Sequence, residues 1–102
     1  MSQPAAQRII VYWRDIPAQV IIRQGRRAEK RELPEQFIKA IDACAMATGA
    51  KDSDAYLAEW RRGAPETCSD DLAAEADAAI TALLSAYDMD RLKQLIANGG
   101  KA

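Results

Sequence analysis

Residues 8–24 read RIIVYWRDIPAQVIIRQ, and this stretch predicts two β-strands joined by a turn. β-branched and aromatic side chains fill both halves of it, which is typical of strands. In the first half, residues 8–14, apolar side chains alternate onto both faces, so we expect a central strand that is covered on both sides, at least in part. Pro17 cannot donate to a strand ladder, and we therefore expect the turn at Asp15–Ala18 and the second strand at residues 19–24.

The rest of the chain extends this hairpin into a predicted α+β fold. Gly25 begins a second turn, and residues 28–33 are expected to form a short, charged strand at a protected sheet edge. The 3- and 4-residue spacing of apolar side chains then predicts helices at residues 34–48, 53–62, 69–87 and 88–98. The expected architecture is a two- or three-stranded antiparallel meander packed against helices, followed by a C-terminal helical hairpin.

The length of 102 residues suits one domain. We expect residues 1–7 to be a disordered tail and residues 8–102 to form the domain. Within it, residues 8–63 are the α+β unit and residues 64–102 are an acidic helical extension. The boundary is placed where Ala64-Pro65 interrupts the helical pattern.

Charge is divided between these two parts, although the net charge is only −1. Residues 1–62 carry 11 Lys/Arg against 8 Asp/Glu, whereas residues 63–102 carry 3 against 7. The molecule is therefore expected to be electrostatically two-ended, without a general attraction to nucleic acid or membrane. No apolar run approaches the ~20 residues of a membrane span. The first residues also lack the basic and apolar regions of a secretory signal, so we expect a cytoplasmic protein.

The absence of histidine restricts the chemistry that this chain can perform. It excludes Ser-His and Cys-His nucleophile pairs, histidine bases and imidazole metal ligands. Cys44 and Cys68 are too few for a structural zinc site. We expect Cys44 in the core and Cys68 near a helix N-terminus, where a thiolate is favoured but the nearby acids oppose it. We therefore predict no enzymatic activity and no cofactor or metal.

The first candidate binding surface is a basic run with one acidic residue among its five cations: Arg23, Arg26, Arg27, Lys30 and Arg31. Such a cluster can contact phosphates, and Tyr12 and Trp13 can stack on bases. The alternative is a solvated sheet edge that is protected by its charges, with the aromatic side chains in the core. The low isoelectric point of about 5.4 favours this alternative.

The second candidate is Trp13-Arg14-Asp15, at the end of the first predicted strand. An arginine beside an aspartate can build a small polar binding site. The structural alternative is that Arg14 stacks on an aromatic ring while Asp15 accepts backbone N–H bonds, so that the pair organises the turn.

An acidic group lies at the start of the third predicted helix and consists of Asp70, Asp71, Glu75 and Asp77. Carboxylates bind divalent cations, but this spacing does not match a calcium loop such as the EF-hand. Negative charges are also favoured at helix N-termini by the helix dipole. We therefore expect these residues to be helix-terminal charges.

Four segments resemble the bacterial virulence factor domain family: YWRDIPAQV at residues 12–20, RQGR at 23–26, LPEQFIKAID at 33–42 and DAYLAEW at 54–60. The resemblance covers residues 8–63 and leaves residues 64–102 outside it. The family includes the domain of conserved virulence factor C, where it is joined to a NifU-like iron–sulfur scaffold domain and helical repeats. Short stand-alone members are associated with folate and corrinoid one-carbon genes. The family has no agreed catalytic residues, so the resemblance assigns none.

Three functions are left open at this point. The missing catalytic groups, the small size and the two-ended charge favour an accessory module that binds another protein. The resemblance implies a subunit or assembly factor of a methyl-transfer or iron–sulfur system. The basic run allows binding of nucleic acid. The sequence does not specify an oligomeric state.

Overall fold

The computed structural model describes residues 4–49 and 53–102. Its strands are β1 (Ala6–Trp13), β2 (Ile16–Gln24), β3 (Arg27–Glu32), β4 (Trp60–Arg62) and β5 (Glu66–Cys68). Its helices are α1 (Glu35–Ala47), α2 (Ser53–Ala58), α3 (Leu72–Ala86) and α4 (Met89–Ala97). The predicted α+β class is confirmed.

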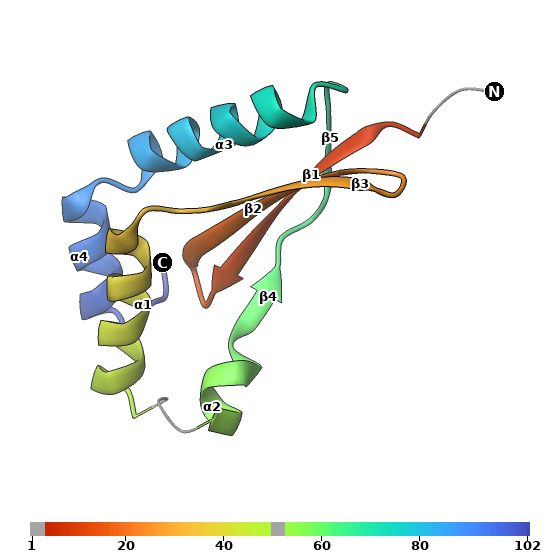
Figure 1. Ribbon diagram of the computed structural model, residues 1–102. Coiled ribbons are helices and arrows are strands. Elements are labelled where there is room, and N and C mark those ends of the chain that lie inside the picture. Colours follow the sequence, from red (N-terminus) through yellow and green to blue (C-terminus); the bar gives the residue numbers. More distant parts are fainter. Residues whose placement is uncertain (1–3, 50–52) are drawn as a thin grey trace.

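The strands form one antiparallel sheet in the order β3-β2-β1-β4, and β5 also pairs with β1. The predicted two- or three-stranded meander is confirmed in its three-stranded form by β1, β2 and β3, and the unpredicted strands β4 and β5 extend the sheet. The predicted central position of the first strand is confirmed as well, because β1 has β2 on one side and β4 and β5 on the other. Figure 1 shows this sheet with α3 along one of its faces and α1 and α4 at one end.

Two apolar clusters hold the helices to the sheet. On the α3 face, Val20 and Ile22 pack with Leu72, Ala76 and Ala79. The side chain of an alanine ends at Cβ, so the helix can lie close to the strands. Pairing of Ile10 with Val20 places the even-numbered residues of β1 on the same face as α3.

The second cluster fills the space between the opposite face and the other helices. Trp13 and Ile16 are completely buried there, against Phe37 of α1 and Leu92 and Leu95 of α4. The indole N–H of Trp13 donates to the backbone oxygen of Tyr56 in α2, at 3.0 Å. This bond leaves the large ring buried without an unpaired polar group.

The turn between β1 and β2 is shorter than the sequence predicted. Trp13 pairs with Ile16, so Arg14 and Asp15 alone form the turn, and Ile16 to Ala18 already belong to β2. Arg14 has a φ of 54°, in the left-handed region that tight turns require. Val11 pairs with Gln19 and Tyr12 with Pro17, which leaves Ala18 as a β-bulge. A proline is tolerated beside a bulge because the ladder is interrupted there.

Two other expectations about secondary structure are wrong. The helix predicted at residues 53–62 ends at Ala58, and Trp60–Arg62 pair with β1 as β4. The expected helical extension begins with a strand, because Glu66–Cys68 pair with Ala6–Arg8 as β5. Both short strands satisfy backbone groups along the second edge of β1, and this tertiary gain overrides local helix propensity.

The ends of the predicted elements also shift. Ala6 is completely buried and begins β1, so residues 6–7 are not a disordered tail, while residues 1–3 lie outside the described part of the chain. The third predicted helix begins at Leu72, after the Asp71 side chain accepts the backbone N–H of Ala74 at 3.2 Å. Asp88 caps α4 as predicted, and accepts the N–H of Arg91 at 2.8 Å.

Candidate functional site

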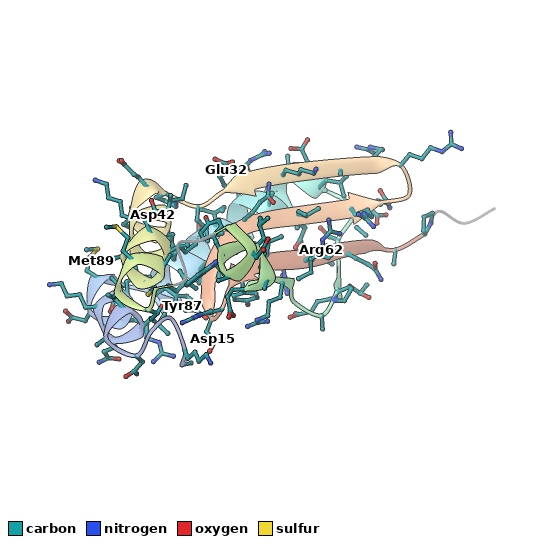
Figure 2. The ribbon with its side chains drawn as sticks, turned by 90° about the horizontal axis from the view of Figure 1, so that it is seen from below. Asp15, Glu32, Asp42, Arg62, Tyr87 and Met89 are labelled. Carbon is teal, nitrogen blue, oxygen red and sulfur yellow. The ribbon has the colours of Figure 1, made fainter. Side chains whose placement is uncertain are left out.

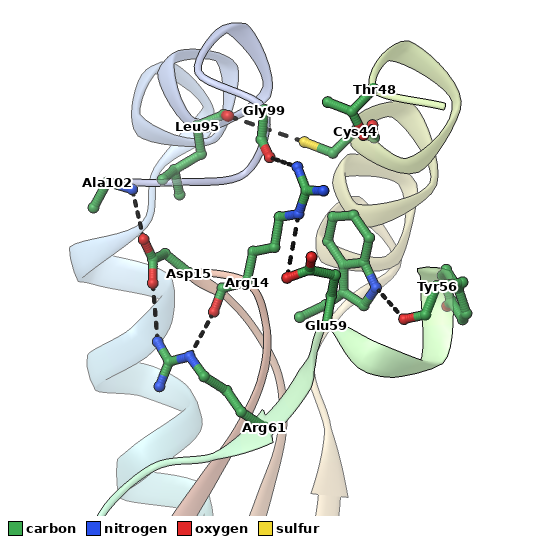
Figure 3. Close-up of polar contacts among 11 residues, drawn as sticks. Arg14, Asp15, Cys44, Thr48, Tyr56, Glu59, Arg61, Leu95, Gly99 and Ala102 are labelled. Carbon is green, nitrogen blue, oxygen red and sulfur yellow. Dashed lines mark hydrogen bonds and ion pairs between the residues drawn. The ribbon is translucent and has the colours of Figure 1, made fainter. Parts of the chain in front are cut away.

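Arg14 is the centre of a polar network at the β1–β2 turn (Figure 3). Its Nη1 donates to the backbone oxygen of Gly99 at 2.6 Å, and its guanidinium carbon lies 4.9 Å from the centroid of the Trp13 ring. Its Nε is 3.5 Å from a carboxylate oxygen of Glu59 but makes no hydrogen bond. The backbone N–H of Arg14 donates to the oxygen of Glu59 at 3.0 Å, which joins the turn to the segment before β4.

Asp15 has its two carboxylate oxygens directed at two different segments. One oxygen accepts from Nη2 of Arg61 at 2.9 Å, and the other accepts from the backbone N–H of Ala102 at 2.7 Å. The pKa of Asp15 is lowered, first by the Ala102 hydrogen bond and then by Arg61, because both stabilise the carboxylate against the opposing effect of burial. The N–H of Asp15 also donates to the oxygen of Gly100 at 2.8 Å.

The structural alternative for Trp13-Arg14-Asp15 therefore describes the observed geometry. Arg14 stacks on an aromatic ring and Asp15 accepts a backbone N–H, as that alternative stated. Their charged groups are directed at β4 and at the residues after α4, so that the network ties three distant segments together.

Four cations of the basic run are exposed, and the fifth, Arg31, forms ion pairs within the molecule. Arg23, Arg26, Arg27 and Lys30 are exposed. Arg31 instead donates to Glu29 at 2.5 Å and lies 3.5 Å from the carboxylate of Asp77 in α3. It faces α3 and helps to hold that helix, so it does not belong with the other four as a free binding group.

The side of the sheet opposite α3 is the most exposed surface that the strands present. Figure 2 views the molecule from this side, and in the part of the chain that is drawn no helix lies over the half nearest the β2–β3 turn. We define the open sheet face as the side chains that the strand register places there, with Glu32 as the one acidic member: Gln7, Ile9, Val11, Gln19, Ile21, Arg23, Ala28, Lys30, Glu32, Arg62 and Thr67.

Three cations surround the apolar centre of the open sheet face. Ile9 and Ile21 pair across β1 and β2 and are only 5% and 3% exposed. Arg23, Lys30 and Arg62 are exposed and take part in none of the ion pairs among residues 4–49 and 53–102. Sequence reasoning missed Arg62, since it placed this residue in a helix; its pairing with Val11 brings it to this face.

The remaining sequence candidates are used locally. Asp71 caps α3, Asp77 contacts Arg31, and Asp70 accepts from the Gln24 amide at 2.9 Å. Glu75 accepts from the hydroxyl of Ser69 at 2.8 Å. In the ranges that the structure describes, no group of three or more Cys, Asp or Glu side chains is arranged to hold a metal ion.

Both cysteines are free thiols, and Cys44 is buried whereas Cys68 is partly exposed. Cys44 is buried in the core as predicted, and burial raises its pKa. Cys68 lies in β5 and not at the N-terminus of α3, which corrects the expectation from sequence. Burial, followed by the charge of Glu75, raises the pKa of Cys68, so the thiol form is favoured.

Comparison with known proteins identifies a family but no individual relative. A family model described as virulence factor matches residues 11–96. No curated protein and no solved structure matches the chain. The match extends well past residue 63 and corrects the expectation that residues 64–102 lie outside the family. The fold explains the extent, because β5 and α3 complete the same sheet and core as β1 and β2. Among the described residues no helix is both long and apolar enough to cross a membrane.

Proposed function

The chain belongs to the virulence factor family, and we propose that it is a non-catalytic accessory module that binds another protein through its open sheet face. The observation that supports this proposal is the set of three cations, Arg23, Lys30 and Arg62, around Ile9 and Ile21. We further propose that it acts in a bacterial cytoplasm, which agrees with its two unpaired thiols.

The chemistry of the open sheet face favours an acidic protein surface. A sheet face is broad enough to receive a helix or a second layer of strands. Unpaired cations at its margin attract carboxylates over a distance and repel basic surfaces, so they select the partner and its orientation. The aliphatic stems of the same side chains supply apolar contact once the partner is bound.

Charge reversal on the open sheet face tests this proposal. The double variant R23E/R62E changes two exposed cations that make no ion pair among the described residues, so the fold should be retained. Its control is K39E/K93E, which reverses two exposed lysines on α1 and α4; the exposed Lys39–Glu35 ion pair that it breaks, at 3.6 Å, contributes little to stability. Tagged wild type and both variants would be used to capture proteins from lysate of the source bacterium.

The expected result is a partner that wild type and K39E/K93E retain and that R23E/R62E loses. Raising the salt concentration from about 50 mM to about 500 mM should release the same partner, because screening weakens exposed charge pairs. Capture of the same proteins by all three forms, or of none by wild type, would contradict the proposal.

A second candidate function is binding of single-stranded nucleic acid, favoured by the exposed cations Arg23, Arg26 and Arg27 at the β2–β3 turn. This function usually requires exposed aromatic rings on which bases stack. On the open sheet face the nearest aromatic residue is Trp60, at its margin and only partly exposed. Titration of labelled RNA and DNA at about 50 mM salt separates the two functions, since a phosphate-binding module binds there and weakens steeply as salt rises.

A further inference from the structure

The outer edge of β3 presents backbone hydrogen-bonding groups in a defined alternation. Gln24 and Arg27 are paired residues on either side of a two-residue turn, a position that exchanges both backbone bonds in a hairpin. Leu33 follows the same odd-numbered alternation, because its N–H points towards β2 and donates to the oxygen of Ala18 at 3.0 Å. The N–H and C=O groups of Ala28, Lys30 and Glu32 must therefore point outward. In the described part of the chain no strand pairs with this edge, and Figure 2 shows no ribbon beyond it.

We propose that a second copy of this chain pairs with this edge, antiparallel, about a two-fold axis that passes through Lys30. The axis must be perpendicular to the sheet, because only then do two identical strands run side by side in opposite directions. Such an axis keeps each side chain on its own face, so a residue can lie opposite itself or opposite one that is two or four positions away.

The charge sequence of β3 selects one register among those that this symmetry allows. With Lys30 on the axis, Glu29 of each copy lies opposite Arg31 of the other, at a pair without mutual hydrogen bonds, where side chains approach most closely. With Glu29 on the axis, Glu29 would face itself and Arg27 would face Arg31. With Arg31 on the axis, Arg31 would face itself and Pro34 would meet the ladder without a donor.

The same register brings the Glu29–Arg31 ion pair of one copy next to the same ion pair of the second copy. Glu29 and Arg31 are held together at 2.5 Å on the α3 face, and Asp77 lies 3.5 Å from Arg31. In the dimer both pairs meet across the axis, so each arginine is shared by carboxylates from two copies. Little side-chain freedom remains to be lost on association, which favours binding.

The dimer is expected to be weak for two reasons. Lys30 faces Lys30 of the second copy on the other side of the sheet, and like charges in this position are destabilising. An edge-to-edge contact also buries much less area than a stable interface, so we expect a dissociation constant on the order of 100 μM. The charged edge still excludes strands of other sequence, whose charges would not match it.

Amide hydrogen exchange, measured by NMR at protein concentrations from about 10 μM to about 1 mM, tests the proposed register directly. The amides of Ala28, Lys30 and Glu32 should become protected as concentration rises. Those of Glu29 and Arg31 already bond to β2 and should not change. Sedimentation equilibrium on the same samples should show a monomer–dimer transition. A monomer at every concentration, or protection that does not alternate along β3, would overturn the proposal.

Substitutions at the axis give opposite expected effects. K30P removes an outward N–H while leaving the β2 ladder intact, so it should abolish the dimer and preserve the monomer. K30T removes the like-charge contact and should tighten the dimer about two- to fivefold. This second variant keeps the test decisive if K30P is poorly folded, because weaker association of a folded K30T would contradict the register.

Charge exchange tests the Glu29–Arg31 contact. E29R and R31E each place like charges at the two closest cross-strand positions and should each weaken the dimer more than tenfold. The double variant E29R/R31E restores opposite charges across the axis but not the contact of residue 31 with Asp77, so it should associate more tightly than either single variant and less tightly than wild type. If each single variant dimerises as well as wild type, this contact does not set the register. These measurements need no partner protein, so their outcome is independent of the proposed function.

Discussion

Of the two residues that form the β1–β2 turn, Arg14 is the one whose replacement should lower the free energy of unfolding more. Arg14→Ala removes a charged donor from the oxygen of Gly99, at 2.6 Å, which contributes about 1.5–3 kcal/mol. It also removes the contact with the Trp13 ring at 4.9 Å, which contributes about 0.5–1 kcal/mol. The 3.5 Å approach to Glu59, whose side chain is 37% exposed, adds at most about 0.5 kcal/mol. We therefore expect the free energy of unfolding to fall by about 3 kcal/mol.

Arg14→Gly separates the side-chain contribution from that of the backbone. Both variants lose the same contacts, but the φ of 54° costs alanine about 1–2 kcal/mol that glycine does not incur. Arg14→Gly should therefore be the more stable of the two by about 1 kcal/mol. Urea unfolding followed by tryptophan fluorescence measures both values, with Arg23→Ala as a control that should change stability by less than about 0.5 kcal/mol. A loss below about 1 kcal/mol for Arg14→Ala would refute the account of the network, and greater stability of the alanine variant would refute the account of the turn.

Three further outcomes can be measured by the same unfolding assay. Gly100→Ala should lower the free energy of unfolding by about 2 kcal/mol, because the φ of Gly100 is 87° and the new Cβ would lie 3.3 Å from the Arg14 side chain. Gly49→Ala should lower it by only about 1 kcal/mol, because Gly49 has a φ of 74° but open space around it. The pKa of Asp15 is lowered from 3.8, so its stabilising effect is complete at pH values well above 3.8 and is lost as pH falls through the lower folded pKa. Asp15→Asn should therefore flatten the decline of stability at acidic pH, and an unchanged slope would contradict this. Trp13→Phe should lower the free energy of unfolding by about 2 kcal/mol, because it removes the indole N–H that donates to the backbone oxygen of Tyr56 at 3.0 Å. Near-wild-type stability of this variant would show that water replaces the indole N–H as the donor.

Local pattern was sufficient to predict the first half of the sheet. The hairpin of β1 and β2 follows from the β-branched residues on both sides of Pro17. Asp88 is a typical capping residue and therefore indicates the start of α4. These features depend on neighbours within a few positions, so a single sequence contains the information. The two-residue turn was not predicted. It requires a positive φ at Arg14, and the residue types in that segment do not indicate one.

The short strands could not be predicted because their cause lies far away in the chain. Tyr56, Leu57 and Trp60 have helical spacing, yet Trp60 pairs with Trp13 at an edge of β1 that needs backbone partners. The same limit applies to the candidate site. Arg31 is engaged and Arg23 is exposed, although both belong to one basic run, because the Asp77 that contacts Arg31 comes from α3. Tertiary contacts, and not composition, decide which cations are available for binding.

The pairing of β1 also has a consequence for the newly made chain. Its partner β2 follows it directly, but its second edge is closed only by residues 60–68. Translation proceeds at about 5–20 residues per second, so the apolar hairpin emerges from the ribosome several seconds before those strands are available. During that interval β1 is an exposed edge strand of the kind that promotes aggregation. The protein is therefore expected to benefit from chaperones that hold nascent chains, and slower translation between residues 24 and 60 should lower its soluble yield.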